Sequence, residues 1–151
     1  MAASPIDRPS APGVPGQPVS AGRVLVVDDN IDAGTPITIL LADMGYDSRF
    51  AGTEMECLEV AAAWHPDIVL LDVFMPQMTG FQLARALREK YSPSTMRLVM
   101  MSGAVLDEHT LLNAGKAGFN SCIGKPVSKL ELARLIADEI SRLVPESNSS
   151  A

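Results

Sequence analysis

Four short apolar runs in this chain of 151 residues are each ended or followed by a polar residue that could do chemistry. Asp28 and Asp29 close the first run, Asp72 the second and Ser102 the third, and Lys125 follows the fourth. Clustered carboxylates repel one another and raise each other's pKa unless a cation neutralises them. Because oxygen ligands suit Mg²⁺ better than zinc, these residues predict a Mg²⁺ site flanked by a hydroxyl and an ammonium, provided that the runs are neighbouring strands.

The runs that carry these residues have the composition of buried strands. Arg23–Asp28, Asp67–Asp72 and Arg97–Ser102 are short and mostly apolar, as strands of a parallel sheet covered on both faces are. Tyr46–Ala51 is more polar and Asn120–Ile123 is shorter, and both patterns favour edge strands.

Helical patterns fill the intervals between the runs. Thr35-Pro36 has the pattern of an N-cap followed by proline at the first helical position, which predicts a first helix that starts there and stops at Gly45. The remaining helices are predicted at Thr53–Trp64, Phe81–Leu87, Leu106–Lys116 and Leu130–Leu143.

Five strands, each followed by a helix, predict an α/β fold. Right-handed crossovers would build a flavodoxin-like three-layer (βα)5 sandwich around a five-stranded parallel sheet of order 2-1-3-4-5. Ligands of such sheets bind beyond the carboxyl ends of the strands, beside the reversal in strand order. All the polar residues named above would lie at that edge.

Composition limits the classes of function. Hydrophobic residues make up 47% and charged residues 20% of the chain, as in a globular domain. The net charge of −6 argues against a nucleic-acid partner. Because no apolar run is long enough to span a membrane and no secretory pattern begins the chain, we expect a cytoplasmic protein without a membrane partner.

Both ends of the chain and its two cysteines predict little chemistry. Residues 1–22 carry a proline at five positions and predict a disordered tail, residues 23–144 the folded domain, and residues 145–151 a flexible tail. Cys57 and Cys122 lack metal-ligand spacing and are expected to be buried, reduced thiols.

Taken together, these motifs resemble the receiver domains of response regulators in two-component signalling. The matching residues are Asp28-Asp29, Asp72 within LLDVFMPQMTG, Ser102 and Lys125-Pro126. Successive intervals of 43, 30 and 23 residues from Asp29 to Lys125 are close to the family's usual spacing. Since nothing after Val144 resembles an output domain, a single-domain response regulator is expected, with a receiver excised from a hybrid kinase as the alternative.

The resemblance implies a role for each matching residue. Asp72 would accept a phosphoryl group from a histidine kinase or histidine phosphotransfer protein, and Ser102 and Lys125 would hold the phosphoryl oxygens. Mg²⁺ would be held by four groups, namely Asp28, Asp29, Asp72 and the backbone carbonyl of Phe74. Such a protein is no enzyme beyond its own phosphorylation and slow dephosphorylation. We expect a monomer or weak dimer that signals to an unknown protein target.

Three positions depart from the familiar receiver pattern. Cys122 stands at the switch position, where Tyr or Phe is usual, so the signal is expected to pass through the loop after Ser102 and the helix that follows it. Phe74 and Ala104 replace polar residues that help to position the hydrolytic water, which predicts slow loss of phosphate. Thr79 stands where Asp is common and is expected to have no consequence.

Two other classes of function stay open on the sequence alone. A haloacid-dehalogenase-type phosphatase also uses a strand-end aspartate with Mg²⁺, but it needs an acid two residues after the nucleophile, where this chain has Phe74. A degenerate receiver could act as a constitutive interaction module. The acidic residues and Lys125 argue against that alternative, whereas Cys122 keeps it open.

Overall fold

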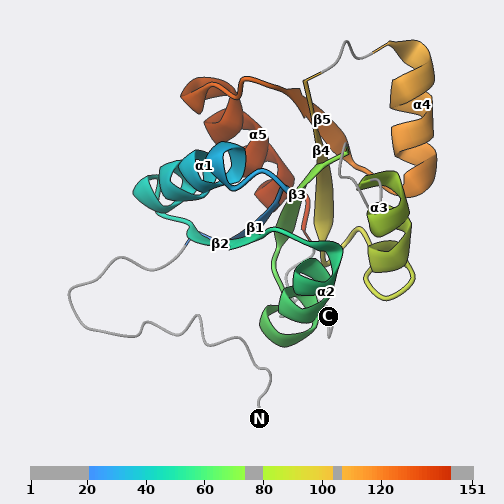
Figure 1. Ribbon diagram of the computed structural model, residues 1–151, viewed down its shortest axis with the longest axis horizontal. Helices are drawn as coiled ribbons and strands as arrows, with labels where there is room; N and C mark the ends of the chain where they lie inside the picture. Colours follow the sequence, from blue (N-terminus) through green and yellow to red (C-terminus); the bar gives the residue numbers. More distant parts are fainter. Residues whose placement is uncertain (1–20, 74–79, 104–106, 144–151) are drawn as a thin grey trace.

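The computed structural model describes residues 21–73, 80–103 and 107–143, in which strands and helices alternate along the chain (Figure 1). The strands are β1 (Arg23–Val27), β2 (Asp47–Ala51), β3 (Ile68–Asp72), β4 (Arg97–Ser102) and β5 (Ser121–Gly124). The helices are α1 (Ile31–Asp43), α2 (Glu54–Trp64), α3 (Gly80–Arg88), α4 (Glu108–Ala117) and α5 (Lys129–Ser141).

The five strands form one parallel sheet of order β2-β1-β3-β4-β5, which confirms the predicted fold class and strand order. All residues of β1 and β3 are buried, as their apolar composition predicts. Burial in β2 is partial and alternates along the strand, as expected at an edge. All strands therefore direct their carboxyl ends toward the same side of the molecule.

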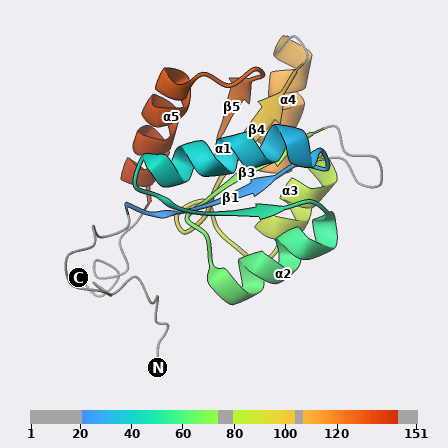
Figure 2. The same ribbon diagram turned by 60° about the vertical axis from the view of Figure 1, so that its left-hand side comes forward.

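Helices cover both faces of the sheet. Figure 2 shows α1 and α5 on one face and α2 and α3 on the other. One core cluster joins the first pair of helices to the sheet through Ile37, Leu41, Leu132 and Ile136, which pack against Val26, Leu70 and Met101. The other cluster joins α2, α3 and α4 to the sheet through Cys57, Ala61, Leu83, Leu87, Ala114 and Ala117, which pack against Leu25, Val69 and Leu98.

Helix α1 begins five residues earlier than the sequence predicts. Its N-cap is Asn30, whose side chain accepts a 3.0 Å hydrogen bond from the Asp32 N–H, and not Thr35. Pro36 therefore lies inside the helix. The prediction was wrong because Asn30 is as good a cap as Thr35. The single backbone bond that proline removes falls on an exposed position, where it costs less than in a buried helix.

The other helices lie close to their predicted positions. Helix α2 begins one residue after the predicted start because Thr53 is its N-cap. Trp64 ends it as predicted, buried beneath the guanidinium of Arg49 at 4.5 Å from the ring centroid. Asp107 caps α4, so this helix starts at Glu108, while Leu106 of the predicted span lies outside the described residues. Met96 before β4 and Met100 and Met101 within it are buried in the core clusters.

The side chain of Arg88, at the end of α3, joins three segments of the chain. Its guanidinium donates hydrogen bonds to the carbonyls of Gly118 (3.0 Å) and Met96 (2.6 Å) and to Asn120 Oδ1 (2.6 Å). Partial burial, together with the charge of Arg97, lowers the pKa of Arg88 to about 10, which leaves it charged at neutral pH. Arg88 therefore holds the end of α4 against α3 and the start of β4.

Most of the two predicted tails, residues 1–22 and 145–151, lies outside the described residues. The last two residues of the first tail are described: the Ala21 N–H donates to the Gly45 carbonyl, and the Gly22 carbonyl accepts from the Asp47 N–H. Within the described part of the chain, no helix combines the length and the apolar character needed to cross a membrane.

Replacing Arg88 with alanine is expected to lower the free energy of unfolding by about 2–3 kcal/mol, because several partly buried acceptors lose their donor together. Urea unfolding followed by circular dichroism measures the change. Arg85→Ala on the exposed side of the same helix is the matched control and should stay within about 0.5 kcal/mol of the wild type. Equal effects of the two substitutions would contradict the role given to Arg88.

Candidate functional site

The sheet brings the polar residues that the sequence singles out to one edge. Asp28 and Asp29 follow β1, Asp72 and Ser102 end β3 and β4, and Lys125 follows β5. Because β1, β3, β4 and β5 are neighbours in that order, the carboxyl ends of four strands lie side by side. The site is therefore at the reversal in strand order, where ligands of such sheets bind.

Asp28 is the most enclosed member of the site, with 0% of its surface exposed. Its Oδ1 accepts a 2.9 Å hydrogen bond from the Asn30 N–H, and its Oδ2 accepts a 2.8 Å hydrogen bond from Lys125 Nζ. Its backbone N–H donates to the carbonyl of Ala51 at the end of β2. Both carboxylate oxygens of this buried charge are therefore paired, as burial requires.

Lys125 joins two of the carboxylates. Its Nζ lies 2.8 Å from Asp28 Oδ2 and 3.5 Å from Asp72 Oδ2. Partial burial by itself lowers the pKa of Lys125, but the hydrogen bond that Lys125 donates to Asp28 and the charges of Asp72 and Asp28 outweigh it and raise that pKa above its ordinary value. The ammonium therefore stays charged throughout the neutral range.

The three aspartates are close enough to share one cation. One carboxylate oxygen from each of Asp28, Asp29 and Asp72 lies within 4.8 Å of the other two, and Asp29 is exposed while the other two are buried. Three carboxylates and one ammonium leave two negative formal charges, which matches a divalent cation. Hard oxygen donors with an open side toward water fit Mg²⁺, so the donor set present suits the metal that the sequence predicts.

Backbone hydrogen bonds between neighbouring strands fix the positions of Ser102 and Lys125 relative to Asp72. The Lys125 N–H donates a 2.8 Å hydrogen bond to the Ser102 carbonyl, and the Lys125–Pro126 peptide bond is cis, as the resemblance implies. The Val73 N–H donates to the Met101 carbonyl at 3.4 Å. Buried Ser102 therefore follows Met101, the register partner of Asp72, and itself pairs with Gly124, the residue before Lys125.

Gly80 allows α3 to begin directly beside the end of β3. Its N–H donates a 3.1 Å hydrogen bond to the Val73 carbonyl. A Cβ atom at this position would lie 2.6 Å from the Asp72 carbonyl oxygen and 2.7 Å from the Val73 Cα, too close for any side chain. Gly80 is thus required by the packing around Asp72.

One site residue escaped the sequence prediction. Asn30 both caps α1 and orients Asp28 through its backbone N–H. The signal was present, because an asparagine that directly follows a strand-end carboxylate pair is a strong candidate for an N-cap. Because Thr35-Pro36 is the more familiar pattern for the start of a helix, the sequence predicts a start later in the chain than Asn30.

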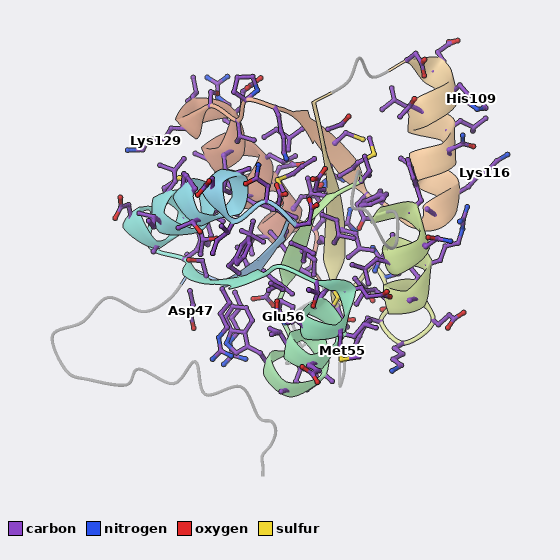
Figure 3. All side chains as sticks on the ribbon, in the orientation of Figure 1. Asp47, Met55, Glu56, His109, Lys116 and Lys129 are labelled. Atoms are coloured by element: carbon purple, nitrogen blue, oxygen red, sulfur yellow. The ribbon has the colours of Figure 1, made fainter. Side chains whose placement is uncertain are left out.

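The structure describes only some of the other residues of interest. Phe74, Thr79 and Ala104 lie outside the described residues. His65 and His109 are exposed, and Figure 3 shows His109 on the outer side of α4. Cys122 lies on β5 opposite Met100 and packs, partly buried, against the α2–α4 side of the core.

Comparison with known proteins decides the family. A family model described as the response regulator receiver domain matches residues 24–137. The chain belongs to the response-regulator receiver family. Its fold agrees: the chemotaxis protein CheY4 of Vibrio cholerae matches with a TM-score of 0.73 at 26% identity, over 78% of this chain and 97% of that one.

Relatives of this receiver differ in length. A 14.6 kDa protein of Leptolyngbya boryana is 31% identical over 124 residues, which cover 82% of this chain and 94% of that protein. The DNA-binding response regulator MtrA of Mycolicibacterium paratuberculosis is 31% identical over 120 residues, 80% of this chain. The match covers only 52% of MtrA, so this receiver spans about half the length of that relative.

The two thiols of the receiver are expected to react differently with Ellman's reagent at pH 8. Burial raises the pKa of Cys57 to about 12, so only about one molecule in ten thousand carries its thiolate at that pH. Burial also raises the pKa of Cys122, but this side chain is partly exposed. One thiol should react slowly in the native protein, faster as the pH rises, and two should react in urea. A Cys122→Ala variant should show none before unfolding, and a rapid reaction of that variant would contradict the burial of Cys57.

Proposed function

We propose that this receiver accepts a phosphoryl group on Asp72 from the phosphohistidine of a histidine kinase or histidine phosphotransfer protein. The observation that carries the proposal is the position of Lys125 Nζ, 2.8 Å from Asp28 and 3.5 Å from Asp72 at the edge of the three-carboxylate cluster. That arrangement offers a nucleophilic carboxylate, a cation site and a fixed positive charge within one small volume. It supports phosphoryl transfer better than a passive binding surface.

The chemistry follows from the groups at the site. An Asp72 oxygen attacks the phosphorus in line, the P–N bond to the donor imidazole breaks, and an aspartyl acyl phosphate forms while the donor histidine leaves. Lys125 and the Ser102 hydroxyl donate hydrogen bonds to the phosphoryl oxygens. Mg²⁺ held by Asp28, Asp29 and Asp72 would offset the negative charge of the transferring group. We propose the Phe74 carbonyl as a fourth ligand; it lies outside the described residues.

The proposed output is a change in protein contact. Phosphate adds about −2 of charge next to Ser102. Because Cys122 has no ring to turn inward, we propose that the change passes from Ser102 into α4, whose Leu111 and Leu112 are 43% and 58% exposed. By analogy with the family, a downstream protein would bind the face formed by α4, β5 and α5. The unit would comprise residues 23–144, act as a monomer or weak dimer, and meet its kinase in the cytoplasm.

Incubation with acetyl phosphate and MgCl₂ is expected to add one phosphoryl group, seen as one added HPO₃ mass by intact mass spectrometry. Asp72→Asn should abolish the adduct because it removes the nucleophile, and chelating Mg²⁺ with EDTA should prevent it. The matched control is Asp47→Asn, an exposed carboxylate on the β2 edge (Figure 3), which should be phosphorylated like the wild type. Continuous release of phosphate without an adduct would favour a phosphatase, and no reaction would favour a constitutive interaction module.

Phosphorylated receiver is expected to lose its phosphate slowly, because Phe74 and Ala104 cannot hydrogen-bond a water through their side chains. Phe74→Asn should accelerate dephosphorylation by roughly tenfold or more, since a positioned polar group assists attack by water. The half-life of the phosphoprotein, followed by intact mass after removal of acetyl phosphate, measures the effect. Phe74→Leu is the apolar control and should keep the wild-type half-life; acceleration in both variants would point to lost shielding instead.

A further inference from the structure

Gly34, the fourth residue of α1, stands where glycine has no conformational advantage. It is buried and helical, and it is not among the described glycines with positive φ, so its backbone suits any residue. Glycine in a helix interior is less favourable than every residue except proline. A packing requirement that forbids a side chain would explain its presence.

The packing around Gly34 supplies that requirement. A Cβ atom there would overlap Cε1 of the Phe50 ring, lie 2.8 Å from Phe50 Cδ1, and lie 3.3 Å from the Cβ of Asp28. Phe50 projects from β2 and packs, partly buried, on the same side of the sheet as α1. The ring thus occupies the space that a side chain at position 34 would need, and Gly34 itself packs closely against the Asp28 side chain, so only glycine fits between the ring and Asp28.

Asp28 has little freedom to absorb a displacement. Its side chain has no exposed surface, and its two oxygens are held by the Asn30 N–H and Lys125 Nζ. A shift of its Cβ by a few tenths of an ångström would alter both hydrogen bonds and the distances from Asp28 to Asp29 and Asp72. The contact with Gly34 and Phe50 is therefore a third constraint on where this carboxylate lies.

We propose that Gly34 and Phe50 are positioning residues of the phosphorylation site: together they fix Asp28 in the place where it can share a cation with Asp29 and Asp72. The inference deepens the proposed function and rests on it for the phosphorylation step. The predicted effect on Mg²⁺ binding does not depend on phosphorylation, because it concerns only the affinity of the aspartate cluster for Mg²⁺. We assign neither residue a contact with the cation or the phosphoryl group.

Gly34→Ala tests the contact, with Gly115→Ala as the matched control. Gly115 is also a helical glycine, but nothing lies within 4 Å of the Cβ that the substitution adds. Gly34→Ala should weaken Mg²⁺ binding, measured by isothermal titration, by about tenfold, the low end for groups that orient metal ligands. Its Asn30 amide signal should move in the metal-free NMR spectrum, because that N–H bonds to Asp28. Gly115→Ala should change neither.

Phe50→Leu completes a double-mutant cycle with Gly34→Ala. The cycle separates an effect on the position of Asp28 from a general loss of packing. Alone, Phe50→Leu should weaken Mg²⁺ binding several-fold, because a gap opens beside Gly34 and loosens the packing of Gly34 against Asp28. Combined with Gly34→Ala, the new methyl group should fill part of that gap and bring the affinity back to within about threefold of the wild type. A double variant that regains thermal stability but not Mg²⁺ affinity would overturn the proposal. If Gly34→Ala fails to fold, Phe50→Leu alone tests the proposal. An unchanged Mg²⁺ affinity and an unchanged Asn30 amide signal in that variant would overturn the proposal.

These outcomes separate the inference from the proposed function. If the wild type takes phosphate but Gly34→Ala binds Mg²⁺ as well as the wild type, only the positioning role fails. If the wild type takes no phosphate while the order of Mg²⁺ affinities holds, only the proposed phosphorylation fails.

Discussion

Mutual repulsion among the carboxylates at one edge of the sheet is the constraint on which the rest of this receiver depends. Asp28 and Asp72 are buried, and Asp29 lies next to them with an oxygen within 4.8 Å. Buried charges of one sign are stable only when a counter-charge and hydrogen bonds compensate them. Lys125 provides the counter-charge, and the backbone N–H of Asn30 provides a further bond to Asp28.

Holding that cluster requires a rigid frame on both sides. The strands that carry the aspartates, β1 and β3, are buried along their whole length, so their ends cannot move apart without opening the core. Two close approaches complete the frame: Gly80 brings α3 against the Asp72 backbone, and Gly34 brings α1 against Phe50 and Asp28. Larger side chains at these two glycines would displace the backbone at Asp72 and the side chain of Asp28, which the site requires to be fixed.

Farther from the cluster, the fold is less tightly held. In α4 the fully buried residues are Ala114 and Ala117, both in the half that Arg88 fastens through Gly118, whereas Leu111 and Leu112 are exposed. The end of this helix that follows Ser102 is thus the less buried one. A change at the aspartate cluster would meet less resistance there than in β1 or β3.

The sequence by itself determined the order of the elements and which of the polar residues at the strand ends come together at one edge of the sheet, Asn30 excepted. Both depend on local patterns: apolar runs of strand length, helical periodicity, and polar residues placed where a run ends. The start of α1 shows where such patterns fail, because Asn30 and Thr35 are both adequate caps and nothing local chooses between them. Only tertiary structure decided that Asn30 caps the helix and also holds Asp28.

Tertiary structure alone also decided that Lys125 pairs more closely with Asp28 than with Asp72, and that Gly34 packs against both Phe50 and Asp28. Lys125 and Asp28 are 97 positions apart in the chain. The distance between them is set by strand order, register and the packing of side chains from several elements. Residue types and spacing can name the partners of such a contact, but the distances arise only when the whole sheet and its helices are packed together.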